Sequence, residues 1–138
     1  PGNITIQNCK FENPISVFRL LFDGRPWCCN RNLGSVTFRN CKFTGVTACI
    51  DLFSGTEEPT DFCMENVEIQ PAAGYEDMEF IRAKNFDRIR LNHVTLKNFR
   101  QPVIVVASPG ESRKIDVLDS TPVSVFVDPA VKTTNPAQ

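Results

Sequence analysis

The sequence predicts an all-β protein, a parallel solenoid of about five coils, and three observations lead to this fold class. A short phrase recurs along the 138-residue chain, as in "NITIQNCKF" (Asn3–Phe11) and "SVTFRNCKF" (Ser35–Phe43). Within each copy, apolar residues alternate with polar ones, as in a strand with one buried face. Helical periodicity is weak, and proline and glycine interrupt the apolar runs too often for long helices.

The repeated phrase has the form apolar-x-apolar-x-Asn-small-x-large apolar. Its copies start at Ile4, Val36, Phe62, Ile89 and, more weakly, Ile115, so that successive starts are separated by 32, 26, 27 and 26 residues. This near-constant spacing predicts that each copy belongs to one coil and that the coils stack on one another. Stacking at about 4.8 Å would form parallel sheets that run along the solenoid.

Each copy is expected to be a strand, a tight bend and a second strand. In the first copy Ile4 and Ile6 share one face, and the alternation slips at Asn8 so that Cys9 and Phe11 return to the same interior. Asparagine tolerates the left-handed backbone region better than most residues, which favours a bend at this position. The predicted structural ladder of bend positions continues at Asn40, Asn66, His93 and Asp119.

A further apolar run follows each copy and predicts another strand, so that each coil has roughly three short strands. These runs are Ile15–Phe22, Ala48–Phe53, Met78–Ala83, Val103–Ala107 and Val123–Val127. The chain is long enough for a single core. We therefore predict one β-solenoid domain over residues 1–128 and a polar C-terminal tail over residues 129–138.

The six cysteines allow two interpretations. They lack a CxxC pair and the chain has one histidine, which argues against a zinc site. Three disulfides in a secreted protein are one interpretation, and small buried apolar residues are the other. Because Cys9 and Cys41 stand where the next coils have valine, and stacked side chains point along parallel directions that suit disulfide torsions poorly, we predict mostly free thiols.

Composition excludes some classes of partner. A net charge of −1 and a pI near 5.9 give no general attraction to nucleic acid or to an anionic membrane. No apolar run approaches the roughly 20 residues that span a bilayer. We expect no nucleic-acid or membrane partner, no cofactor and no metal.

With this pattern repeating and an asparagine at the bend, the chain resembles the right-handed, single-stranded parallel β-helix of the pectin lyase-like superfamily. Phrases of the "NITIQNCKF" type are most similar to glycoside hydrolase family 28, the polygalacturonase group, and the stretch from "YEDMEFIRAKNF" to "STPVSV" resembles its closing coils. The resemblance implies a polysaccharide or oligosaccharide partner, an extracellular or periplasmic location and, if the protein is active, hydrolysis of pectic polysaccharide. It also implies the C-terminal portion of a longer β-helix, because members have about ten coils.

The chain departs from the family at the catalytic signatures. The forms N-T-D, D-D, G-H-G and R-I-K are absent, His93 has no flanking glycines, and "RIR" (Arg88–Arg90) opens a predicted core strand. No catalytic residue can be transferred by resemblance. We expect that the chain lacks a complete catalytic centre.

Candidate site residues come from the strand that would line the family's sugar-binding cleft. Asp51 and Glu79 lie on this strand in adjacent coils, and two carboxylates at suitable separation are what glycosidic hydrolysis requires. Arg19 and Arg82 on neighbouring turns are candidates for substrate binding. The alternative is that all four are ordinary solvated charges on an outer strand face.

Two aromatic residues in the loops are further candidates for substrate binding. Trp27 lies in the long insertion Phe22–Gly34, and Tyr75 lies in the "PAAGYEDM" segment. Exposed aromatic rings stack on sugar faces. Alternatively, Trp27 plugs the first coil as a hydrophobic lid.

The sequence therefore leaves three functions open. The first is a carbohydrate-active domain of a pectin-like polysaccharide hydrolase or binding protein. The second is a non-catalytic structural or oligomerisation module, like a spike or adhesin segment, in which uncapped coil ends associate end to end as a homo-oligomer. The third is a sugar-binding module in its own right.

Overall fold

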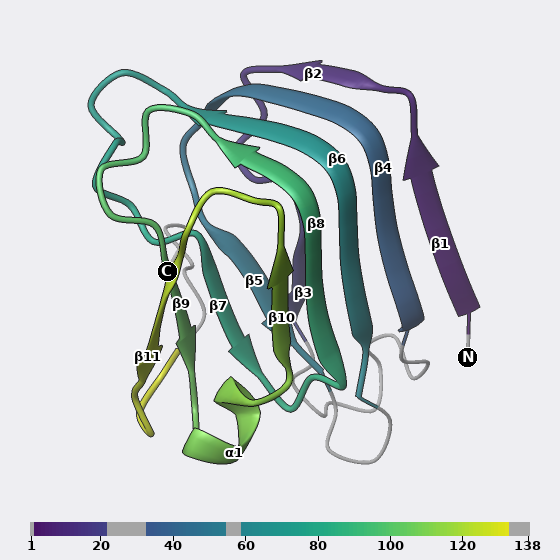
Figure 1. Ribbon diagram of the computed structural model, residues 1–138, viewed down its shortest axis with the longest axis vertical. Helices are drawn as coiled ribbons and strands as arrows, with labels where there is room; N and C mark the ends of the chain where they lie inside the picture. Colours follow the sequence, from purple (N-terminus) through teal and green to yellow (C-terminus); the bar gives the residue numbers. More distant parts are fainter. Residues whose placement is uncertain (1, 22–32, 55–58, 133–138) are drawn as a thin grey trace.

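The computed structural model describes residues 2–21, 33–54 and 59–132, which form an almost entirely β structure of two parallel sheets (Figure 1). One sheet has six strands and the other has five. Every strand pair is parallel. The all-β class and the parallel sheets predicted from the sequence are confirmed.

The first sheet, sheet A, contains the repeated phrase of every coil. Its order is β1-β4-β6-β8-β10, with β2 beside β4. The strands are β1 (Gly2–Gln7), β2 (Lys10–Glu12), β4 (Leu33–Val46), β6 (Asp61–Pro71), β8 (Arg88–Leu96) and β10 (Ile115–Leu118).

The second sheet, sheet B, is built from the second apolar run of every coil, in the order β11-β9-β7-β5-β3. Its strands are β3 (Arg19–Leu21), β5 (Ile50–Phe53), β7 (Ile81–Lys84), β9 (Val103–Val106) and β11 (Ser124–Val127). Each of the five predicted runs supplies one of these strands, although every strand is shorter than its run and β7 ends one residue beyond it, at Lys84. The chain alternates between the sheets, so each repeat extends both.

Strand pairing follows the sequence repeat. Ile4 pairs with Val36, Val36 with Phe62, Phe62 with Ile89, and Ile89 with Ile115. These are the first apolar positions of the five copies, so the spacing seen in the sequence is the stacking period of the structure.

The bend ladder is also present. Asn8, Asn40, Asn66, His93 and Asp119 have φ angles of 58°, 54°, 53°, 56° and 48°, in the left-handed region. In β4, β6 and β8 the bend does not end the strand, which differs from the prediction of separate short strands (Figure 1). A single left-handed residue turns the chain, and pairing resumes at once on its far side, as Cys41 with Val67 follows Arg39 with Glu65.

The core lies between the two sheets and is best closed in the middle coils. Val36, Phe62 and Ile89 are fully buried, whereas Ile4 in the same ladder is 40% exposed. The ring of Phe62 contacts those of Phe18 and Phe38, at centroid distances of 5.8 and 6.0 Å. Burial of such large apolar side chains is the main source of stability in a structure with little helix.

Of the four described cysteines, Cys41 and Cys49 agree with the packing interpretation, and Cys9 and Cys63 are partly exposed. Cys9, Cys41, Cys49 and Cys63 are free thiols. Cys41 and Cys49 are buried, and Cys63 is on the outer side of β6, as its phase predicts. Cys28 and Cys29 lie outside the described residues.

The first residues of the predicted tail pack against sheet B. Val131 is buried, and the backbone carbonyl of Lys132 accepts a hydrogen bond of 2.7 Å from Arg82 Nη1. In the part of the chain that the structure describes, no helix is long and apolar enough to cross a membrane.

Candidate functional site

A groove with a cavity volume of about 720 Å³ lies on the outer face of sheet B, beside β9 and β11. The residues that give it chemical character are Asp77, Glu79, Gln101, Val105, Ser124 and Phe126. We call it the sheet B groove.

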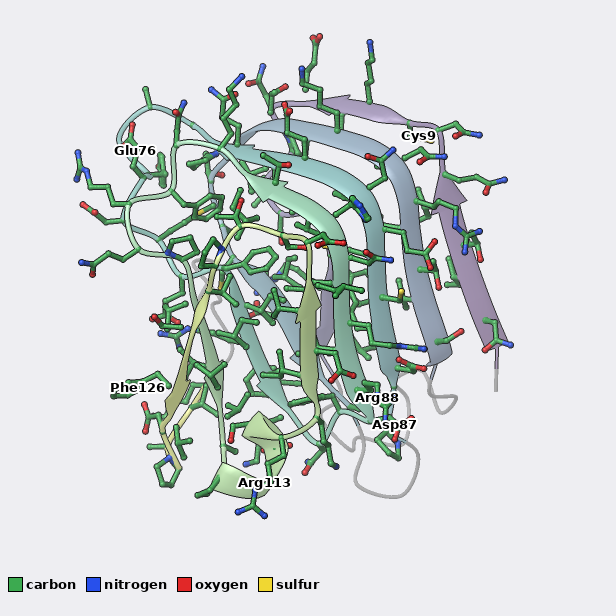
Figure 2. All side chains as sticks on the ribbon, in the orientation of Figure 1. Cys9, Glu76, Asp87, Arg88, Arg113 and Phe126 are labelled. Atoms are coloured by element: carbon green, nitrogen blue, oxygen red, sulfur yellow. The ribbon has the colours of Figure 1, made fainter. Side chains whose placement is uncertain are left out.

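Strand alternation explains why Val105 and Phe126 face outward. In β9 the residues Ile104 and Val106 are buried in the core, so Val105 points to the other face. Phe126 pairs with Val105 in register and therefore shares that face. Its ring is 60% exposed, and Figure 2 shows it projecting from β11 away from the interior.

Both carboxylates of the groove are held by arginines. Glu79 accepts two hydrogen bonds from Arg82, with Nε–Oε2 at 2.6 Å and Nη2–Oε1 at 2.9 Å. The hydrogen bond from Arg82 to Glu79 raises the pKa of Arg82, so this guanidinium stays charged. Asp77 accepts a hydrogen bond of 2.7 Å from Arg100 Nη1, in an exposed pair. The two hydrogen bonds from Arg82 fix Glu79, whereas the exposed pair with Arg100 constrains Asp77 less, and both carboxylates keep oxygen lone pairs for a ligand.

Asp51 occupies the outer position of β5 but is not exposed. It pairs in register with Arg19 on one side and Arg82 on the other. Its Oδ2 lies 3.0 Å from Arg19 Nε, and its side chain is 0% exposed, against 26% for Arg19. The structure therefore joins Asp51 to Arg19, and Glu79 to Arg82, but places only Glu79 along the groove.

Of the two predicted aromatic residues, the one that the structure describes, Tyr75, does not line the groove. Tyr75 is 45% exposed in a turn, where its backbone N–H donates to the carbonyl of Ala72 at 3.0 Å. Trp27 lies outside the described residues. Among the described residues, the exposed ring in the groove is that of Phe126, which lies in a predicted strand. Aligning Phe126 with Arg82 through the coil repeat would have identified it as outward-facing.

A second, shallower groove of about 380 Å³ follows the bend ladder of sheet A. Asn40 Nδ2 donates to Asn8 Oδ1 at 3.2 Å, and Asn66 Nδ2 donates to Asn40 Oδ1 at 2.8 Å. His93 Nδ1 lies 2.7 Å from Asn92 Oδ1. Since the amides satisfy one another along the stack, the ladder is explained by its role in stabilising the bends.

No group of three or more His, Cys, Asp or Glu side chains in the described ranges is arranged to hold a metal ion. Compared with known proteins, the chain matches no family model, no curated protein and no solved structure.

Proposed function

We propose that this chain is a carbohydrate-binding module that holds a polysaccharide, of the pectin-like class that the resemblance implies, in the sheet B groove. The observation that supports this most directly is the groove itself, where two carboxylates from the segment before β7 lie beside an exposed phenylalanine ring on β11. Sugars present hydroxyl groups that donate to carboxylates and an apolar ring face that packs on aromatic side chains. We place the module outside the cytoplasm on the same resemblance.

We further propose that the architecture is a right-handed parallel β-helix. Two parallel sheets that each gain one strand per repeat support this proposal, as does the left-handed residue at the sheet A bend of every coil. The handedness rests on the resemblance to the pectin lyase-like superfamily.

We favour binding over hydrolysis because of the position of Asp51. A side chain that is 0% exposed and paired with Arg19 offers no oxygen to a substrate on the surface. Of the two carboxylates predicted as a catalytic pair, only Glu79 lines the groove, so the pair is not available to a substrate there. Arg19 binds Asp51 and Arg82 binds Glu79, so both predicted substrate-binding arginines form ion pairs within the protein.

The binding test measures the affinity of the protein for soluble pectin, polygalacturonate and rhamnogalacturonan by affinity electrophoresis and calorimetry. We expect retardation by at least one polymer and a loss of about tenfold or more in affinity for Phe126→Ala. Leu118→Ala is the matched control, since Leu118 is 59% exposed but does not line the groove. Equal affinity for both variants, or no binding to any polymer, would contradict the proposal.

Hydrolysis is tested separately by following new reducing ends in the same polymers. We expect no release above background. If reducing ends are released, and both Asp51→Asn and Glu79→Gln abolish the release, the catalytic pair predicted from the sequence is established. Hydrolysis then replaces binding as the function.

A second candidate function, a structural module that associates end to end, is favoured by the two end faces of the stack. Core-facing side chains that are buried in the middle coils are partly exposed there: Ile4 and Phe11 at one end, Val117 and Val125 at the other. Among the described strands, β1 and β10 each have only one neighbour along the path of sheet A. A second copy of the chain could pair β10 with β1 in the same parallel direction.

A further inference from the structure

We infer that the sheet B groove selects uncharged saccharides and discriminates against anionic ones, such as free uronic acids. This inference rests on the proposed function and specifies its ligand. Pectic chains occur both with free carboxylates and with the same carboxylates as methyl esters, so the two forms share one backbone and differ in charge.

The ionisable side chains that line the groove all have one sign. Among the described residues that line the groove, the ionisable ones are Asp77 and Glu79, and none is basic. Arg82 and Arg100 do not themselves line the groove, but they pair with these carboxylates and partly offset their charge. A ligand in the groove therefore meets carboxylate oxygens first, and a ligand carboxylate would be placed beside like charge.

The remaining lining is suited to an uncharged sugar. Gln101 and Ser124 offer neutral donors and acceptors, and Phe126, beside the largely buried Val105, offers an exposed apolar surface. Hydroxyl groups of a sugar can donate to Asp77 and Glu79, whereas an ionised carboxylate can only accept. Both the charge and the hydrogen-bonding capacity of the groove favour the neutral ligand.

The size of the effect follows from the exposure of the site. Because the groove is open to solvent, like charges a few ångströms apart are partly screened, and discrimination of about tenfold is expected at low salt. Discrimination should fall as the ionic strength rises, since salt screens charges over about 10 Å at 0.1 M.

The experiment uses three hexasaccharides with one backbone: oligogalacturonate, its full methyl ester and its carboxyl-reduced form. Calorimetry at low salt should show the two neutral probes binding about tenfold more tightly than the acid, with a smaller ratio in 0.5 M NaCl. Oligogalacturonate binding as tightly as the neutral probes would overturn the inference and leave the proposed function standing. Binding of none of the three probes would overturn the inference, and the polymer assay then decides the proposed function separately.

Charge removal provides the second measurement. Asp77→Asn combined with Glu79→Gln should raise the affinity for oligogalacturonate about tenfold relative to the methyl ester. Asp77→Asn alone should give a smaller shift in the same direction and retain the fold, because Asp77 is exposed and its ion pair with Arg100 is on the surface. An unchanged ratio in both variants would show that the carboxylates do not set the selectivity.

Discussion

At the scale of single residues, one left-handed bend residue in each coil determines where the chain turns, and it is asparagine at Asn8, Asn40 and Asn66. The left-handed conformation at these positions costs most residues about 1–2 kcal/mol, and asparagine reduces this cost through its short polar side chain. The stacked amides then hydrogen-bond to one another, as Asn40 does with both Asn8 and Asn66. Local preference and stacking therefore act at the same residue.

The central asparagine of this ladder gives a test that separates the two effects. Asn40→Ala should lower the free energy of unfolding by about 2–3 kcal/mol, because it loses both the left-handed preference and the amide hydrogen bonds. Asn40→Gly should cost about 1 kcal/mol less than this, since glycine adopts the backbone angle freely. Urea unfolding measures both. Equal losses would show that the backbone conformation contributes nothing at this position.

Cys63 gives a prediction on reactivity. Burial, followed by the nearby charge of Glu65, raises the pKa of the Cys63 thiol. The folded state therefore retains the thiol proton more tightly: this contribution to stability is present below the ordinary thiol pKa and is lost as the pH rises through the raised value. We expect iodoacetamide to alkylate Cys63 more slowly than the same cysteine in the unfolded chain at pH 8.

Peptide mass spectrometry resolves Cys63 from the other cysteines. Glu65→Gln should speed the reaction because it removes one cause of the raised pKa. A folded protein whose Cys63 reacts as fast as in urea would contradict the assignment.

At the scale of elements, the strands follow from the apolar runs, but their continuity and the short helix do not. Two predicted strands merge across each bend of β4, β6 and β8, since pairing with both neighbours holds the chain extended through the left-handed residue. The helix α1 (Pro109–Ser112) begins after Ser108, whose side chain accepts from the backbone N–H of Glu111. Serine followed by proline and, three residues after the serine, by glutamate is a helix-start pattern, but the strand prediction did not include this helix.

Glu111 connects this helix to the neighbouring coil. Its carboxylate is largely buried and accepts from the backbone N–H groups of Asn85 at 2.7 Å and Ala107 at 3.2 Å. Asn85 is itself left-handed, with φ of 60°. The Glu111 carboxylate therefore accepts hydrogen bonds from two backbone N–H groups that do not take part in β pairing.

Replacing Glu111 tests the importance of this connection. Glu111→Ala should destabilise the protein by about 2–3 kcal/mol because it leaves two N–H groups without their charged acceptor. Glu111→Gln should cost about half as much, since a neutral oxygen still accepts one bond. Thermal unfolding ranks the variants, with Glu12→Ala on the exposed edge strand β2 as a control that we expect to be neutral. A neutral result for Glu111→Ala would contradict the proposed connection.

At the scale of the whole molecule, the stack presents two apolar end faces. If they associate, head-to-tail pairing of copies is heterologous and produces open assemblies that grow with concentration. Sedimentation velocity should then show a series of larger species, and Val117→Lys should reduce them by placing a charge on one end face. Thr95→Lys is the control, because Thr95 is exposed on β8 in the interior of the stack. A monomer at all concentrations would exclude the second candidate function.

The groove and the end faces also predict different consequences of the same substitutions. Phe126→Ala should reduce carbohydrate affinity without changing the sedimentation profile, since the Phe126 ring is on the outer face of sheet B. Val117→Lys should change the sedimentation profile without changing the carbohydrate affinity. The two functions can thus be assigned independently.

The sequence by itself determined the all-β class, the stacking period, the bend positions and the apolar faces of the coils. It did so because these properties are local and repeat: alternation sets which face is buried, and asparagine sets where the backbone turns. Only the tertiary structure decided which outward side chains are exposed. Asp51 stands in register with Arg19 and Arg82 and is fully buried in an ion pair. Phe126 stands at the same position of the last coil, in register with Val105, and is exposed. Exposure of an outward side chain depends on neighbours from other coils, and alternation along one strand carries no information about them.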